Sequence, residues 1–291
     1  MDFGRLIVAM VTPYKSDLEV DYDKVKLLAA RLEGQGVTAL VVSGTTGESP
    51  TLTREEKIKL IKTVKATVKI PVIANVGTND TKVSTSNALD ASIAGADGVL
   101  VVAPYYNKPD QDMLYDHFAA IARAVNLPVM LYNVPGRTGV NIQAETVIRL
   151  SRDVPNIVSI KDASGNLDAM TNILNGAAPG FLVYTGEDSM TLPSLAIGAY
   201  GVVSVAAHVT AVQMAAMVAA HLSGKHDEAA RLHGLLCDIN RILFLQPNPV
   251  PVKKALALCG FDAGGLRPPL KEASADITRQ LKDALAVLGL A

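Results

Sequence analysis

One lysine stands where an amine could do chemistry. Lys161 directly follows the short apolar run 157–160, which is typical of a buried strand. At the end of such a strand, loss of hydration favours the neutral form of a lysine amine, and the neutral amine attacks carbonyl groups. From spacing alone, the alternative is a hydrated lysine at the junction of a strand and its loop.

A tyrosine occupies the matching place one run earlier. Tyr132 ends the apolar run 128–132. If the two runs are neighbouring strands, Tyr132 lies beside Lys161, where a phenol could move protons to and from a carbinolamine. The alternative for an isolated tyrosine is a hydrogen-bonded residue at the rim of the sheet.

Two further segments could bind anionic groups. Thr45 and Thr46 lie in the glycine-flanked turn 44–47, which offers hydroxyls and backbone N–H groups to a carboxylate or phosphate. This turn lacks the lysine and the spacing of a P-loop, and the chain contains no GxGxxG fingerprint. Arg137 lies in a stiff Pro-Gly turn, and its planar guanidinium suits a carboxylate, although an exposed loop arginine would look the same.

The elements that must position these groups recur along the chain. Short apolar runs alternate with helical stretches, at the spacing of a strand, a helix and two loops. The runs are 6–10, 37–42, 71–75, 98–102, 128–132, 157–160, 181–184 and 201–205. They are continuously apolar, as strands of a parallel sheet covered on both faces should be.

Eight such units favour an α/β fold of the (β/α)8 TIM-barrel type over a doubly wound sheet. In such barrels catalytic groups come from the carboxyl ends of the strands, where all the candidates above lie. After about residue 224 the alternation stops, and helical segments follow, broken at 246–251 and 264–265. We therefore expect a catalytic barrel over 1–224 and a C-terminal helical domain over 225–291.

Composition narrows the functional class. The chain of 291 residues has 49% hydrophobic residues and a net charge of −1, so it lacks the basic footprint of a nucleic-acid or membrane-surface protein. The stretch 202–222 is largely apolar, but it contains His208, Thr210, Gln213 and His221 and is therefore too polar to span a bilayer. Cys237 and Cys259 are expected to be reduced thiols in a cytoplasmic protein. The five histidines show no metal-ligand spacing.

Several motifs occur together in a specific order. In chain order, the motifs are Gly-Thr-Thr-Gly-Glu at 44–48, Tyr-Tyr-Asn-Lys-Pro at 105–109, the segment 132–139, Ile-Lys-Asp at 160–162 and Pro-Asn-Pro-Val-Pro-Val-Lys at 247–253. Each motif alone is modest, but the ordered set resembles the dihydrodipicolinate synthase family from near residue 4 to the C-terminus. The resemblance implies condensation of pyruvate with L-aspartate 4-semialdehyde to 4-hydroxy-tetrahydrodipicolinate, in diaminopimelate and lysine biosynthesis, without metal or cofactor.

The resemblance also assigns catalytic roles. Lys161 would form a Schiff base with pyruvate, and Tyr132 would be the general acid and base. Thr45 and Tyr106 would complete a proton relay, with the Tyr106 hydroxyl reaching in from a neighbouring subunit. A homodimer, usually paired into a tetramer, is therefore implied.

Substrate-binding roles follow from the same resemblance. Thr46 and adjacent N–H groups would hold the pyruvate carboxylate, and Arg137 would bind the carboxylate of the semialdehyde. The Val203 carbonyl would face the pyruvate site, and Gly186 belongs with these substrate-binding residues.

Two alternatives stay open. N-acetylneuraminate lyases and keto-sugar-acid aldolases resemble the chain at Tyr132 and Lys161, but typically lack an equivalent of Arg137. A barrel that binds a keto acid without turnover is an alternative of another class, and the complete set of reactive residues argues against it.

The chain departs from the family's lysine-inhibited members. Thr81 and Thr85 stand where those members commonly carry Asn and Glu, while Arg54 and Lys57 occupy positions that are His in some of them. Ser49 and Tyr105 still match those members, so part of that site is retained. Fewer carboxylates and more cations should repel the ammonium groups of lysine, so we expect weak or no lysine inhibition.

Overall fold

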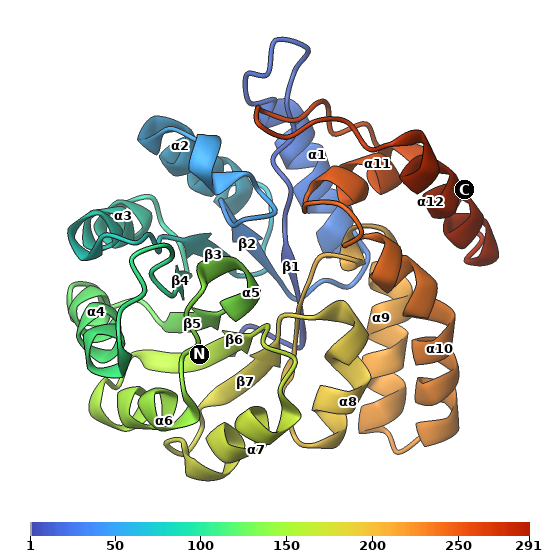
Figure 1. The fold of residues 1–291 in the computed structure, drawn as a ribbon. Coiled ribbons are helices and arrows are strands. Elements are labelled where there is room, and N and C mark those ends of the chain that lie inside the picture. The colour runs from blue at the N-terminus through green and yellow to red at the C-terminus, as the bar shows by residue number, and fades with distance from the viewer. Residues whose placement is uncertain (1) are drawn as a thin grey trace.

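The computed structural model describes residues 2–291, and its centre is a closed barrel of eight parallel strands in sequential order. Figure 1 looks down the barrel, with the helices in an outer ring. The strands are β1 (Leu6–Ala9), β2 (Ala39–Val42), β3 (Val72–Asn75), β4 (Gly98–Val102), β5 (Val129–Asn133), β6 (Ile157–Asp162), β7 (Leu182–Thr185) and β8 (Gly201–Ser204). The predicted (β/α)8 barrel is confirmed.

The helices follow the strands around the ring. Those of the barrel are α1 (Tyr22–Gly34), α2 (Arg54–Lys65), α3 (Thr81–Ile93), α4 (Gln111–Arg123), α5 (Pro135–Thr138), α6 (Ala144–Asp153), α7 (Leu167–Gly176), α8 (Thr191–Ala196) and α9 (Ala207–Leu222), with the short 3₁₀ helices η1 (Ser49–Thr51) and η2 (Asp188–Met190). Two apolar clusters support the ring, one inside the barrel and a larger one between strands and helices.

The strand bounds differ from the predicted runs for local reasons. Pro71 and Pro128 accept hydrogen bonds from neighbouring strands but have no N–H to donate, so β3 and β5 begin one residue later. The second strand begins at Ala39, not at residue 37. Before it, the Leu6 N–H donates to the Thr38 hydroxyl instead of to a backbone carbonyl, while the Leu6 carbonyl accepts from the Thr38 N–H and hydroxyl. At the other end, β6 continues through Lys161 instead of ending before it.

The C-terminal segment forms three helices, α10 (His226–Ile242), α11 (Val250–Leu258) and α12 (Ala275–Val287). In Figure 1 they lie at one flank of the barrel, where α10 and α11 pack against α9 and α12 packs against α10 and α11. The predicted break at 246–251 is too long, because α11 already includes Val250 and Pro251, and proline is tolerated in a first helical turn. Whether 225–291 is a separate domain stays a prediction.

Two local features of the fold follow from the sequence. Thr53 caps α2 in a reciprocal capping box with Glu56. The apolar stretch 202–222 divides into β8 and the largely buried helix α9. Among residues 2–291, no helix combines the length and apolar character that crossing a membrane requires.

Candidate active site

The centre of the candidate site is a lysine beside a tyrosine at the carboxyl end of the barrel. Parallel pairing of β5 with β6 sets Tyr132 next to Lys161 in register. The Lys161 ammonium lies 4.3 Å from the centroid of the Tyr132 ring, and both side chains are buried. The structure thus brings together the two residues that strand order had placed side by side.

The next residues along both strands fix this pairing. Asn133 and Asp162 are paired in register, and the Asn133 amide donates to the Asp162 carboxylate at 3.1 Å. Burial raises the pKa of Asp162, while hydrogen bonds from Ser164 and Asn133 oppose that change. A buried carboxylate that accepts these bonds holds the ends of β5 and β6 together, and with them Tyr132 and Lys161.

Gly186 leaves room for the lysine side chain. A Cβ atom at this position would lie 2.8 Å from Lys161 Cε and 2.8 Å from Ala163 Cβ. Both separations are too short for carbon atoms, so a side chain here would displace Lys161. Gly186 also lines the cavity, and its expected place among the substrate-binding residues stays a prediction.

The loop after β2 supplies hydroxyl groups to the same cavity. Thr45 is half-buried and Thr46 is buried, and both line the cavity. The Thr46 hydroxyl oxygen accepts a hydrogen bond of 2.8 Å from the Asn248 amide. Its own hydrogen therefore stays available for an acceptor in the cavity, such as a carboxylate oxygen.

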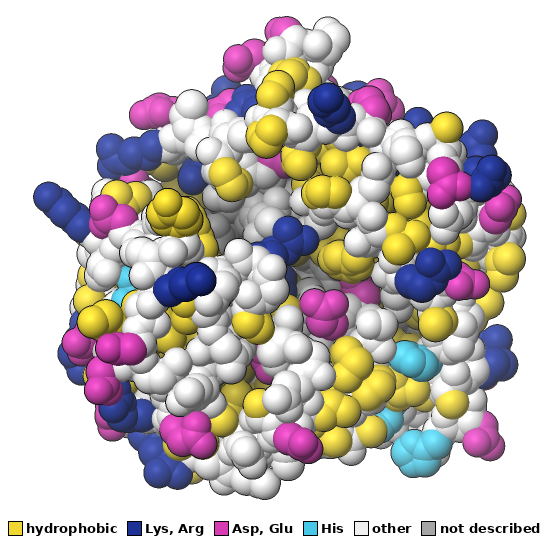
Figure 2. All heavy atoms as spheres, viewed as in Figure 1, with side chains coloured by type: hydrophobic (Ala, Val, Ile, Leu, Met, Phe, Trp, Pro, Cys, Tyr) yellow, Lys and Arg dark blue, Asp and Glu magenta, His cyan; other side chains and the backbone are white. Residues whose placement is uncertain are grey.

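The cavity itself is small. Its volume is about 70 Å³, and because one water needs about 10–15 Å³ by this measure, it has space for a few water-sized groups, the size class of a short keto acid. Figure 2 shows the hollow at the centre of this face, with basic and acidic side chains at its edge. Arg137 and Glu187 are the charged lining residues besides Lys161 in the described part of the chain.

Two neighbouring carboxyls lie at the β7 side of the cavity. Burial, and next the charge of Asp188, raise the pKa of Glu187, while Lys161 and Arg137 act in the opposite direction. Burial also raises the pKa of Asp188. Its carboxylate accepts hydrogen bonds from the Ser204 hydroxyl and from the backbone N–H groups of Val205 and Ala206. Asp188 thus joins the loops that follow β7 and β8.

Two predicted site residues lie away from the cavity. Tyr106 is 88% exposed. It is not among the residues of the described chain, 2–291, that line the catalytic cavity. Val203 is fully buried inside the barrel, and Val205 lines the cavity in its place. The roles expected for Tyr106 and Val203 stay predictions.

Comparison with known proteins places this geometry in a family. The model of the dihydrodipicolinate synthetase family matches residues 2–288. The chain belongs to the dihydrodipicolinate synthetase family. Over the full length of both chains it is 48% identical to the 4-hydroxy-tetrahydrodipicolinate synthase of Moorella thermoacetica.

Solved structures of dihydrodipicolinate synthases have the same fold. The enzyme of Cyanidioschyzon merolae, crystallised with lysine bound, is 44% identical, and the likeness covers 99% of each chain with a TM-score of 0.98. The chloride-inhibited synthase of Acinetobacter baumannii, complexed with pyruvate, is 37% identical, and the likeness covers 100% of each chain with a TM-score of 0.96.

Within this dihydrodipicolinate synthetase fold, sequence reasoning missed two lining residues. Asn248 belongs to the motif at 247–253, but its bond to Thr46 joins positions far apart in the chain. Glu187 directly follows Gly186 in the sequence, and this position beside an expected substrate-binding residue was a usable signal. Among residues 2–291, no group of three or more His, Cys, Asp or Glu side chains is arranged to hold a metal ion.

A second, larger cavity adjoins the first. Its volume is about 370 Å³, and Thr45 and Arg137 line both cavities. Ser49, Lys57 and Tyr105 also line it, which places part of the expected lysine-inhibition position next to the candidate active site.

The other residues of that expected position have partners of their own. Arg54 forms a two-point ion pair with Asp90 at 2.5 and 2.7 Å. The Thr81 hydroxyl is 2.8 Å from His117 Nδ1, and the Thr85 hydroxyl donates to the Thr81 carbonyl. Among the described residues, the cations that line this cavity are therefore Lys57 and Arg137, whereas Arg54 does not line it and its charge is compensated by Asp90.

Proposed function

We propose that this chain condenses pyruvate with L-aspartate 4-semialdehyde to form 4-hydroxy-tetrahydrodipicolinate, through a Schiff base on Lys161. The observation that carries the proposal is the buried amine of Lys161 beside the Tyr132 ring, in a cavity of keto-acid size. The family match along residues 2–288 supports the same reaction. Incubation with pyruvate and borohydride, followed by an assay for semialdehyde-dependent product, tests it directly.

The chemistry begins at the keto carbon. The neutral Lys161 amine adds to it, and loss of water gives a protonated imine, which withdraws electrons from the adjacent methyl group. Removal of a methyl proton gives an enamine, whose carbon attacks the aldehyde. The amine of the second substrate then adds to the imine carbon, which closes the ring and releases Lys161. Tyr132, with Thr45, moves the protons that these steps require.

The two substrate carboxylates would bind at opposite sides of the cavity. Thr46 offers its hydroxyl hydrogen to the pyruvate carboxylate, since Asn248 already occupies an acceptor position on its oxygen. Arg137 is exposed at the border of the two cavities, where a guanidinium can meet the second substrate as it enters.

We expect Arg137→Ala to impair use of the semialdehyde more than formation of the pyruvate imine. Loss of a charged hydrogen bond of about 1.5–3 kcal/mol corresponds to a rise of about 10- to 100-fold in the semialdehyde KM. The measurement compares steady-state kinetics with borohydride trapping of pyruvate. Arg149→Ala is the matched control, because Arg149 pairs with Asp112 on the exposed surface. Equal damage to trapping would contradict this role for Arg137.

We propose that the protein self-associates as a dimer or tetramer and acts in the cytoplasm. The exposed Tyr106 supports association, because its hydroxyl can serve a catalytic centre only if it reaches the cavity of another subunit. The free thiols of Cys237 and Cys259 are consistent with a reducing compartment.

Lysine is expected to inhibit weakly or not at all. Burial lowers the pKa of Lys57, which means that its surroundings already disfavour a cation. An ammonium group of a bound lysine would add a second positive charge beside it. Activity measured against rising lysine checks this expectation. Half-inhibition below about 1 mM, a Kd equivalent to roughly 4 kcal/mol of binding, would contradict it.

A further inference from the structure

The loop that carries Thr45 and Thr46 has an unusual backbone at both ends. Ser43 has a φ of 57° and Glu48 a φ of 58°, both in the left-handed region that residues other than glycine rarely adopt. Such a conformation persists only where surrounding contacts impose it. The loop therefore depends on what it touches outside β2 and η1.

Contacts from the C-terminal segment fix this loop. Both oxygens of the buried Glu48 carboxylate are engaged there, one in an ion pair with Lys253 at 2.7 Å and the other by the backbone N–H of Arg267 at 2.9 Å. Asn248 binds the Thr46 hydroxyl, as described above. Two further contacts come from the barrel side. The Thr12 hydroxyl donates to the Gly47 carbonyl at 2.7 Å, and the Asn75 amide donates to the Ser43 carbonyl at 3.1 Å.

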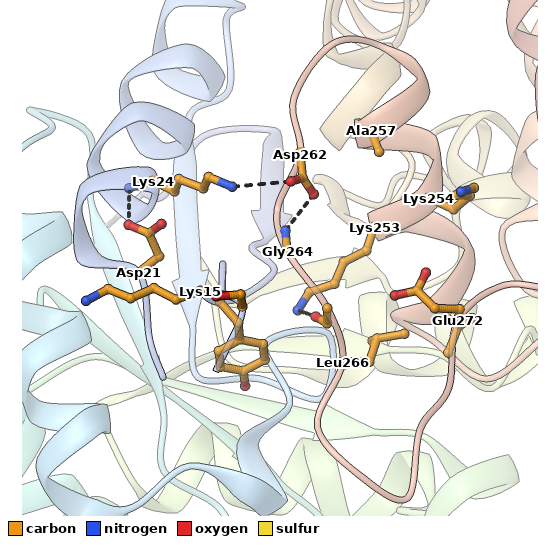
Figure 3. A pocket seen from close by; sticks show the side chains of 14 residues that line it. Lys15, Asp21, Lys24, Lys253, Lys254, Ala257, Asp262, Gly264, Leu266 and Glu272 are labelled. Carbon is orange, nitrogen blue, oxygen red and sulfur yellow. Dashed lines mark hydrogen bonds and ion pairs between the residues drawn. The ribbon is translucent and has the colours of Figure 1, made fainter. Parts of the chain in front are cut away.

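Lys253 is itself held tightly. It extends from α11, and its ammonium donates to the Gly265 carbonyl at 2.8 Å and lies 4.1 Å from the centroid of the Tyr14 ring. Figure 3 shows Lys253 at the wall of a cavity between the N-terminal loop and the C-terminal segment, with its amine directed toward the chain beyond Gly264. Only 4% of its side chain is exposed, and 2% of that of Glu48.

The ion pair between Glu48 and Lys253 lies outside the lining of the catalytic cavity. Neither Glu48 nor Lys253 lines that cavity, whereas Thr45, Thr46 and Asn248 do. A buried ion pair is costly to break on one side, because the remaining charge has lost both water and partner. We propose that Glu48 and Lys253 are positioning residues, which hold the 43–48 loop in the conformation that presents Thr45 and Thr46 to the pyruvate carboxylate. This inference rests on the proposed function for the identity of the substrate.

Lys253→Met tests the inference, because methionine keeps an unbranched apolar chain and removes the charge. We expect the pyruvate KM to rise about 10-fold or more, since misplacing a binding group by about 1 Å can cost about 10²-fold, while the semialdehyde KM changes less than about two-fold. Lys24→Met is the matched control. Lys24 lines the same cavity in Figure 3 and pairs with the exposed Asp262 at 3.4 Å, and it should leave both constants unchanged.

A double variant separates positioning from stability alone. Glu48→Gln combined with Lys253→Met leaves no uncompensated buried charge, so its Tm should recover relative to Lys253→Met, while the pyruvate KM should stay raised. Recovery of the KM together with the Tm would overturn the inference, because the pair would then serve only stability. The same conclusion would follow from a folded Lys253→Met variant with unchanged pyruvate KM.

Amide hydrogen exchange tests the loop without any substrate. In the double variant, residues 43–48 should exchange faster than in the parent protein, while the strands of the barrel keep their protection. Unchanged exchange in the loop would overturn the inference. If the parent protein failed to trap pyruvate, the proposed function would be wrong, and the exchange result would still decide whether the ion pair holds the loop.

Discussion

Replacing Lys161 with alanine should abolish covalent trapping of pyruvate by borohydride and reduce synthase activity below detection. Lys161 is the one lysine that lines the catalytic cavity in the described residues 2–291, so no other amine there can form the imine. Mass spectrometry of the borohydride-treated protein measures the adduct directly. The expected result is an unmodified mass for Lys161→Ala and a single adduct for the parent protein.

Two further variants sharpen that experiment. Lys161→Arg keeps the positive charge but has no amine that can add to a carbonyl, so it should also fail to trap pyruvate. Lys57→Ala removes a lysine from the adjoining cavity and should trap normally. An adduct on the Lys161→Ala protein would refute both the mechanism and the assignment of Lys161 as the attachment site.

Tyr132→Phe should lower kcat by about 10²- to 10⁴-fold, with a much smaller change in the pyruvate KM. The substitution keeps the aromatic ring beside the Lys161 amine and removes only the hydroxyl that would carry protons. Steady-state kinetics and the rate of imine formation measure the two effects separately. A large rise in KM with kcat intact would mean that Tyr132 only positions the substrate.

Tyr184→Phe is the matched control for this prediction. Tyr184 pairs with Lys161 in register from the opposite side, on β7, but it does not line the cavity. Its hydroxyl is buried without a side-chain partner, so its removal leaves no unsatisfied group behind. Activity close to that of the parent protein is expected, which would show that loss of a phenol near Lys161 is not harmful in general.

The barrel was predictable from the sequence because each strand carries its own signal. A continuous apolar run marks a strand buried on both faces, and the order of the runs determines which strands are neighbours. The adjacency of Tyr132 and Lys161 follows from these two facts, and the register of β5 and β6 confirms it. Their catalytic roles stay predictions until the variants are measured.

Contacts between distant segments were not predictable in this way. The bond from Asn248 to Thr46 and the ion pair between Lys253 and Glu48 each join the loop after β2 to a region about two hundred residues later. No periodicity in one sequence reports such a pairing. No pattern in the sequence predicted that Tyr106 is exposed on its own chain, and its expected catalytic role stays a prediction.

The dependence of the 43–48 loop on the C-terminal segment has a consequence for synthesis of the protein. The last barrel strand ends at Ser204, whereas three of the groups that hold the loop belong to Asn248, Lys253 and Arg267. A nascent chain can therefore contain every strand of the barrel before it contains these three groups. Emergence of residues 248–267 from the ribosome, and not closure of the barrel, is the event after which the pyruvate-binding loop can reach its working shape.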